Sequence, residues 1–154
     1  MLSEEQRTKL RPRVASLQSI AGAMLAASLL AAVVIGTIAD WDELGDPLSM
    51  LPLIGAVFGM LMVGSGIVFP LVFAGELATG DSEEEKLKSA AQAVTVEYLV
   101  RFALVEAALF TNLLVLMLDL HTVTLGIVGL AILTFLFLFP IQSRFIGSVE
   151  KRLR

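Results

Sequence analysis

A single carboxyl group lies inside an apolar stretch in the second half of the sequence. Glu106 is the one charged residue between Arg101 and Asp119. Removal from water favours the protonated form of a carboxyl. Such a group can exchange a proton or bind a cation, or it can hold neighbouring helices together by a hydrogen bond. The residues alone leave both uses open.

Further polar groups are candidates for one site with Glu106. Counting from the middle of each apolar block at about 1.5 Å per residue places Ser65 and Thr134 at nearly the depth of Glu106. Pro70 has no N–H to donate to the carbonyl of Gly66, so that oxygen lacks its helical partner. The predicted proton or cation site therefore comprises Glu106, Ser65, Gly66, Thr134 and, as a weaker member, Asn112.

Other residues with reactive side chains are few. The chain has no cysteine, and its one histidine, His121, lies in a short turn between Asp119 and Thr122. A divalent-metal site of His121 with the acidic segment 40–46 is not expected, because Asp40-x-Asp42 lacks the oxygen spacing of a calcium loop. The sequence contains no nucleophile elbow or phosphate loop, and its basic residues form only short clusters. We therefore expect no enzyme, no metal, no cofactor and no nucleic-acid partner.

The elements that must position these groups are long and apolar. Of the 154 residues, 56% are hydrophobic and 17% are charged, against about 45–50% and about 25% in soluble domains. The apolar residues are gathered in four blocks, each close to the roughly 20 residues that span a bilayer core. We predict an all-α fold, a polytopic integral membrane four-helix bundle that forms one domain over residues 1–154. The spans are expected at about 16–38, 50–73, 99–119 and 122–142, with a connector at 74–98.

The basic residues predict the orientation. All 11 Lys and Arg residues lie before the first span, between the second span and the start of the third, or after the fourth. The opposite loops, 40–49 and 120–121, contain none. By the positive-inside rule both termini are cytoplasmic, which places the chain in a cell inner membrane with the lipid bilayer as its partner. A second copy of the chain, or a partner within a membrane complex, is left open.

The connector before the third span carries a helix start. Ser82 and Glu85 have the spacing of a capping box, and Glu84 faces Lys88 one turn later. An apolar stripe follows at helical spacing, so we predict a helix from residue 82 to at least 98. A solvated connector is favoured over a docking handle for a soluble partner. The stripe consists of Leu87, Ala91, Val94 and Tyr98.

Small residues in the first two spans predict close packing between these helices. Gly55 and Gly59 form a GxxxG pattern, and the first span offers a stripe that includes Ala32 and Gly36. Helices in lipid associate where small residues let their backbones approach. Packing within the chain is favoured, and a dimerisation face is the alternative.

The residues around Glu106 also carry a resemblance. Residues 103–116 read ALVEAALFTNLLVL, and a glycine-containing span precedes them across the connector. Residues 98–116 resemble the proton-carrying helix of the c subunit (proteolipid) of rotary ATP synthases, in which a glutamate follows Ala-Leu-Val. This resemblance implies that Glu106 exchanges a proton. The chain is also similar to small four-helix bacterial integral membrane proteins, which implies the fold and no activity.

Two functions therefore compete. The first is a small membrane protein with a structural or accessory role. The alternative is a proton or cation carrier centred on Glu106. The surroundings of that carboxyl separate the two, because a carrier needs polar groups that converge on it, whereas structural use needs only a partner on a neighbouring helix.

Overall fold

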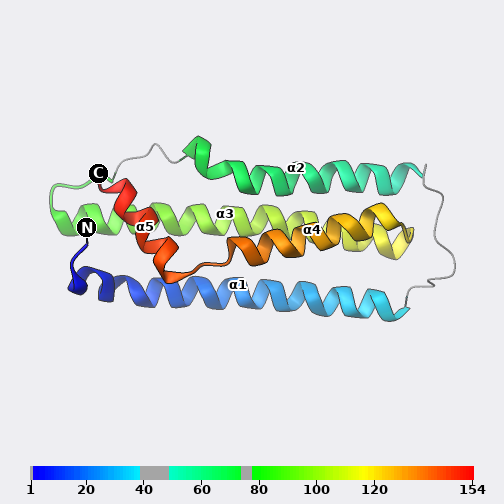
Figure 1. The fold of residues 1–154 in the computed structure, drawn as a ribbon, viewed down its shortest axis with the longest axis horizontal. Helices are drawn as coiled ribbons and strands as arrows, with labels where there is room; N and C mark the ends of the chain where they lie inside the picture. The colour runs from blue at the N-terminus through cyan, green and yellow to red at the C-terminus, as the bar shows by residue number, and fades with distance from the viewer. Residues whose placement is uncertain (1, 39–48, 74–77) are drawn as a thin grey trace.

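The computed structural model describes residues 2–38, 49–73 and 78–154, which form helices and connections without strands. Figure 1 shows an elongated bundle with α3 at its centre, α1 and α2 on opposite sides of it, and both chain termini at one end. The helices are α1 (Glu4–Ile38), α2 (Met50–Phe73), α3 (Glu83–Leu118), α4 (Thr122–Leu138) and α5 (Gln142–Arg152).

The helices agree with a membrane fold in length and composition. In the described part of the chain, α1, α2 and α3 are each long and apolar enough to cross a membrane. A fourth crossing results only if α4 and α5 are counted together as one bent span. The structure thus confirms an all-helical protein with three or four helices of membrane-spanning character.

A proline accounts for the shortness of α4. The fourth span was expected to reach residue 142, but α4 ends at Leu138, two residues before Pro140. A proline disfavours helical backbone at the residue before it, and Phe139 accordingly adopts ψ 133°. Gln18 of α1 donates a hydrogen bond to the carbonyl of Pro140 at 2.9 Å, which fixes this break to a neighbouring helix. The chain then turns by 69° into α5.

The predicted start of α3 is confirmed in detail. The Ser82 hydroxyl accepts from the N–H of Glu85, and the Glu85 carboxylate accepts from the N–H groups of Asp81 (2.9 Å) and Ser82 (3.2 Å). These backbone N–H groups hold the pKa of Glu85 below its usual value. From this cap α3 continues without a break for 36 residues, about 54 Å, whereas a bilayer core is about 30 Å thick.

The excess length of α1 and α3 builds a compact cluster at the end that carries the termini. This head consists of residues 4–17 of α1, residues 83–98 of α3 and the whole of α5. The predicted apolar stripe of α3 is buried in it, against α1 and α5, rather than exposed. The amphipathic helix α5, which was not predicted, contributes Phe145 and Val149 to the same core.

Three glycines of α2, Gly55, Gly59 and Gly66, pack against α3 rather than against α1. A Cβ atom added at Gly55 would lie 2.9 Å from Val115 Cγ2, and one added at Gly66 would lie 3.2 Å from Val105 Cγ2. At Gly59 it would meet the Asn112 amide and Ile127 of α4. The GxxxG pattern therefore serves packing within the chain, but between the second and third apolar helices.

Candidate functional site

The Glu106 carboxyl meets the first helix. The Ser28 hydroxyl of α1 donates a hydrogen bond to Glu106 Oε1 at 2.7 Å. Ser28 is fully buried, and the second carboxyl oxygen, Oε2, is also buried but has no hydrogen-bond partner among the described residues. The arrangement joins α1 to α3 through one bond in the apolar part of the bundle.

The other members of the predicted site lie elsewhere. Ser65 is exposed on α2, and Thr134 is buried on α4, but neither has a hydrogen bond to Glu106. Gly66 faces Val105 and the carbonyl of Arg101. The structure therefore does not gather these groups around the carboxyl; α2 lies on one side of α3 and Ser28 comes from the other (Figure 1).

Asn112 forms a separate polar point between α2, α3 and α4. Its Nδ2 donates to the carbonyl of Ala108 at 2.8 Å, four residues earlier in the same helix. Its Oδ1 is buried without a partner among the described residues and lies over Gly55. The Asn112 side chain thus fills the space on the surface of α2 that is open because Gly55 and Gly59 have no side chains.

Ser28 was missed as a partner of Glu106. Ser28 lies on α1, which runs parallel to α3, whereas the expected partners Ser65 and Thr134 lie on α2 and α4, which run opposite to it. One signal was available, because Ser28 is the only polar side chain between Ile20 and Gly36. A lone hydroxyl inside an apolar helix is a natural partner for a lone carboxyl at similar depth.

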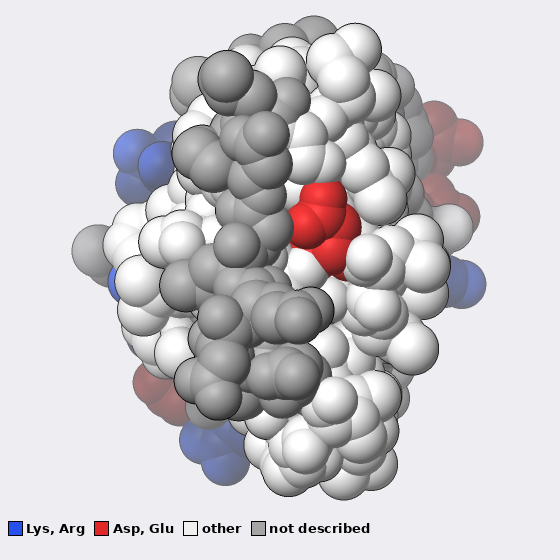
Figure 2. Space-filling model, turned by 90° about the vertical axis from the view of Figure 1, so that its right-hand side faces the viewer, with Lys and Arg blue, Asp and Glu red and all other residues white. Residues whose placement is uncertain are grey.

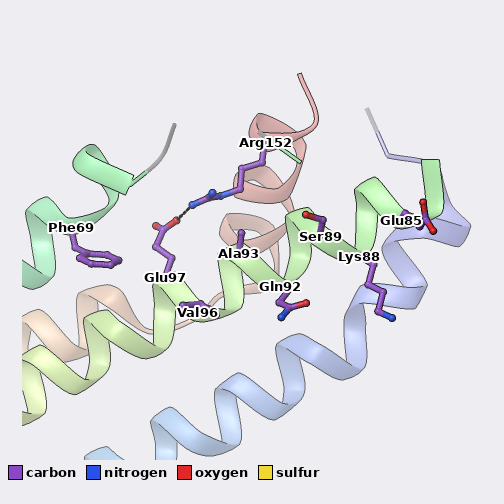
Figure 3. Close-up of a pocket in the computed structure, with 9 residues that line it drawn as sticks. All are labelled: Phe69, Glu85, Lys88, Ser89, Gln92, Ala93, Val96, Glu97 and Arg152. Carbon is purple, nitrogen blue, oxygen red and sulfur yellow. Dashed lines mark hydrogen bonds and ion pairs between the residues drawn. The ribbon is translucent and has the colours of Figure 1, made fainter. Parts of the chain in front are cut away.

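A second buried polar group lies at the base of the head. Glu97 accepts from Arg101, one helical turn later in α3, at 3.1 Å and from Arg152 of α5 at 3.0 Å. The side chains of Glu97 and Arg152 are 10% and 7% exposed. Figure 3 shows the Glu97–Arg152 bond joining α3 to the C-terminal turn of α5. This triad fastens the last helix to the central one.

Further bonds hold the termini to the head. Glu150 of α5 accepts from the N–H of Leu2 at 3.0 Å and from Arg7 at 3.4 Å. The Leu2 N–H is the main reason that the pKa of Glu150 lies below its usual value. The expected Glu84–Lys88 pair is not formed; Glu84 lies 3.8 Å from Lys9 of α1 instead.

Two grooves flank α3 in the head. One has a volume of about 530 Å³ and is lined by residues of α2, α3 and α5, among them Phe69, Gln92 and Arg152 (Figure 3). The other, called the α1–α3 groove below, consists of two cavities of about 390 Å³ and about 200 Å³ that share Arg13. Neither of them is lined by Glu106.

The opposite end of the bundle carries acidic rather than basic groups. Figure 2 looks onto this end and shows acidic surface near its centre, with basic side chains only at the outer edges. Asp119 ends α3 and accepts from the Ser49 hydroxyl at 2.5 Å, and His121 Nδ1 accepts from the N–H of Val123 as the cap of α4. The acidic segment 40–46 lies outside the described residues.

In comparisons with known proteins, no family model, no curated protein and no solved structure matches this chain.

Proposed function

We propose that this protein has a structural or accessory role in a bacterial inner membrane, without enzymatic activity. It crosses the membrane four times with both termini in the cytoplasm. In the fourth crossing α4 lies in the bilayer, and its bent continuation α5 returns the chain to the head. In this role α3 is a continuous column that links the membrane-embedded helices to the cytoplasmic head.

The Ser28–Glu106 bond is the observation that carries this proposal. It uses the one carboxyl in the apolar part of α3 to join two helices, and the other polar residues expected near it are directed elsewhere. Interhelical hydrogen bonds in lipid contribute about 0.6 kcal/mol on average and up to about 1.7 kcal/mol. A hydrogen bond that contributes this much free energy helps to keep α1 and α3 packed together, as a structural role requires.

The second candidate is a proton or cation carrier centred on Glu106. The buried Oε2 atom favours it, because an oxygen without a partner among the described residues is available to carry a proton. The resemblance of residues 98–116 to the c subunit points the same way. A carrier further needs a polar route to this atom from each side of the membrane.

The orientation can be tested with reporters. A reporter fused after Arg154 and one inserted at Asp46 are expected in opposite compartments, with the Arg154 reporter in the cytoplasm, because every Lys and Arg lies on the side of the termini. Alkaline phosphatase and green fluorescent protein fusions read the two sides independently. Activity of both fusions in one compartment would refute the four-span arrangement.

The Ser28–Glu106 bond can be tested with a double-mutant cycle. Ser28→Ala and Glu106→Leu are expected to show a coupling energy of about 0.6–1.7 kcal/mol in the free energy of unfolding, measured in mixed micelles. Glu106→Gln keeps a hydrogen-bonding group of similar size and should preserve stability. Thr37→Ala is the control, since Thr37 bonds to the carbonyl of Val34 and should not couple to Glu106. A Ser28–Glu106 coupling indistinguishable from zero would remove the basis of the proposal.

A further inference from the structure

The α1–α3 groove has two parts of different character. The part nearer the starts of α1 and α3, called the upper part, is basic, and the part farther along both helices, called the lower part, is apolar. Lys9 and Arg13 of α1 face Lys88 of α3 around the upper cavity, with Glu84 as the acid among its lining residues. The lower cavity is lined by Leu17, Ile20 and Val96, among other residues. The lining positions follow one another every three or four residues along both helices, so the two cavities form one continuous groove.

Two of the three cations in this groove form no ion pair among the described residues, although Lys88 interacts with Glu85 through space. Lys9 lies 3.2 Å from Glu5 and 3.8 Å from Glu84, so its charge is already balanced. Arg13 and Lys88 form no ion pair among the described residues. Figure 3 shows the Lys88 side chain directed toward α1 and away from the Glu97–Arg152 bond. The upper groove is therefore complementary to an anion.

The lower groove suits an apolar chain. The side chains of Ile20 and Val96 are 44% and 50% exposed in the folded chain, and the lower cavity holds about 390 Å³. Exposed apolar side chains beneath unpaired cations match the two ends of a lipid molecule, a charged headgroup and an acyl chain.

The position of the groove along α1 also fits a membrane surface. After Arg13, α1 continues without charge to Ile38, a stretch of about 25 residues or about 37 Å, against about 30 Å for a hydrocarbon core. Arg13 thus lies several ångströms outside the hydrocarbon, at headgroup depth. Ile20 lies about 10 Å deeper, where acyl chains begin.

We propose that the α1–α3 groove binds one anionic phospholipid, with its phosphate between Arg13 and Lys88 and one acyl chain against Ile20 and Val96. The lipid occupies the leaflet on the side of the termini and bridges α1 and α3 where the head meets the membrane. This site is independent of Glu106, so its failure would leave the proposed structural role of the bundle untouched.

The test uses the full chain, purified in dodecyl maltoside, and measures its thermal unfolding midpoint. Dioleoylphosphatidylglycerol, dioleoylphosphatidylcholine and inorganic phosphate are titrated separately, because a ligand of the folded state raises the midpoint with its concentration. We expect phosphatidylglycerol to act at a concentration at least about tenfold below phosphatidylcholine. We expect the combined variant Arg13→Gln and Lys88→Gln to weaken phosphatidylglycerol binding by about thirtyfold.

Matched variants separate a defined site from diffuse attraction. Arg11→Gln with Lys151→Gln removes two exposed cations outside the groove and should change phosphatidylglycerol binding less than threefold. Ser16→Trp fills the lower groove and should weaken phosphatidylglycerol binding with all cations in place. If the combined groove variant does not fold, Lys88→Gln alone, at an exposed position, serves in its place.

Three results would overturn the proposal. An equal loss in the Arg11 and Lys151 variant would show that the charged surface binds lipid without a site. Equal potency of inorganic phosphate would identify a free-anion site, and equal potency of phosphatidylcholine would show binding without headgroup selection.

Discussion

Replacing Glu97 with alanine is expected to destabilise the head by about 3–5 kcal/mol, because the change removes the carboxylate that the partly buried Arg101 and the buried Arg152 share. Removing one partner of a buried ionic group costs far more than the group contributes when it is intact, since the remaining charges stay out of water. The free energy of unfolding in mixed micelles, followed by circular dichroism, measures this loss. Because Arg152 belongs to α5, the C-terminal helix should also become more sensitive to protease.

A surface glutamate on the same helix provides the control. Glu83 pairs with Lys86 at 3.7 Å, but its side chain is 84% exposed, so Glu83→Ala should cost less than about 1 kcal/mol. Replacing the whole triad by Glu97→Leu, Arg101→Met and Arg152→Met should recover much of the loss, because the arginine charges are then removed together with the carboxylate. A Glu97→Ala variant as stable as Glu83→Ala would contradict the buried triad.

The second large effect is expected at Gly59. An alanine Cβ at this position would lie 2.6 Å from Ile127 Cγ2 and closer still to Asn112 Nδ2, so either these two side chains or α2 itself must shift. Overpacking of this kind costs about 1–3 kcal/mol, and Gly59→Val should cost more than Gly59→Ala. The same unfolding measurement applies.

Gly64 offers the matched control, since a Cβ added there has no neighbour within 4 Å. Gly64→Ala should be neutral or stabilising by up to about 1 kcal/mol, because alanine is the better helix former. Adding Asn112→Ala to Gly59→Ala should restore part of the stability by making room for the new methyl group. Equal effects of Gly59→Ala and Gly64→Ala would show that α2 does not approach α3 closely at this point.

Local chemistry explains what the sequence predicted well. The cap at Ser82 and Glu85 depends on residues three apart, and the i,i+4 pair of Glu97 with Arg101 depends on one helical turn. The length of α2 follows from an apolar block bounded by polar segments. Each of these features is decided within a few residues of itself, whereas the Glu84–Lys88 pair, with the same spacing, is not formed because Glu84 lies near Lys9 of α1.

Features that depend on distant partners were not predictable in the same way. The segment 142–152 is too short and too polar to be recognised as a helix until α1 and α3 provide a surface for Phe145 and Val149. The third member of the Glu97–Arg101 cluster, Arg152, lies in α5, 55 residues after Glu97. The first span was expected from about residue 16, whereas α1 begins at Glu4 and continues through Pro12.

The candidate site illustrates the same division. Glu106 could be singled out from the sequence because a lone carboxyl in an apolar helix is costly there. Its partner could not be chosen by depth alone, since Ser28, Ser65 and Thr134 are all hydroxyls of similar depth. Which one meets the carboxyl depends on the arrangement of the helices around α3, and α1 covers the side that Glu106 faces.

Proton flux through reconstituted vesicles tests the central claim, a structural role for Glu106, most directly. The full chain is placed in vesicles with a potassium gradient and valinomycin, and the internal pH is followed with a fluorescent dye. The structural account predicts that wild type and Glu106→Gln show the same flux as empty vesicles, because the carboxyl serves only as a partner for Ser28. A wild-type flux clearly above that of empty vesicles, abolished by Glu106→Gln in a variant that folds normally, would contradict it.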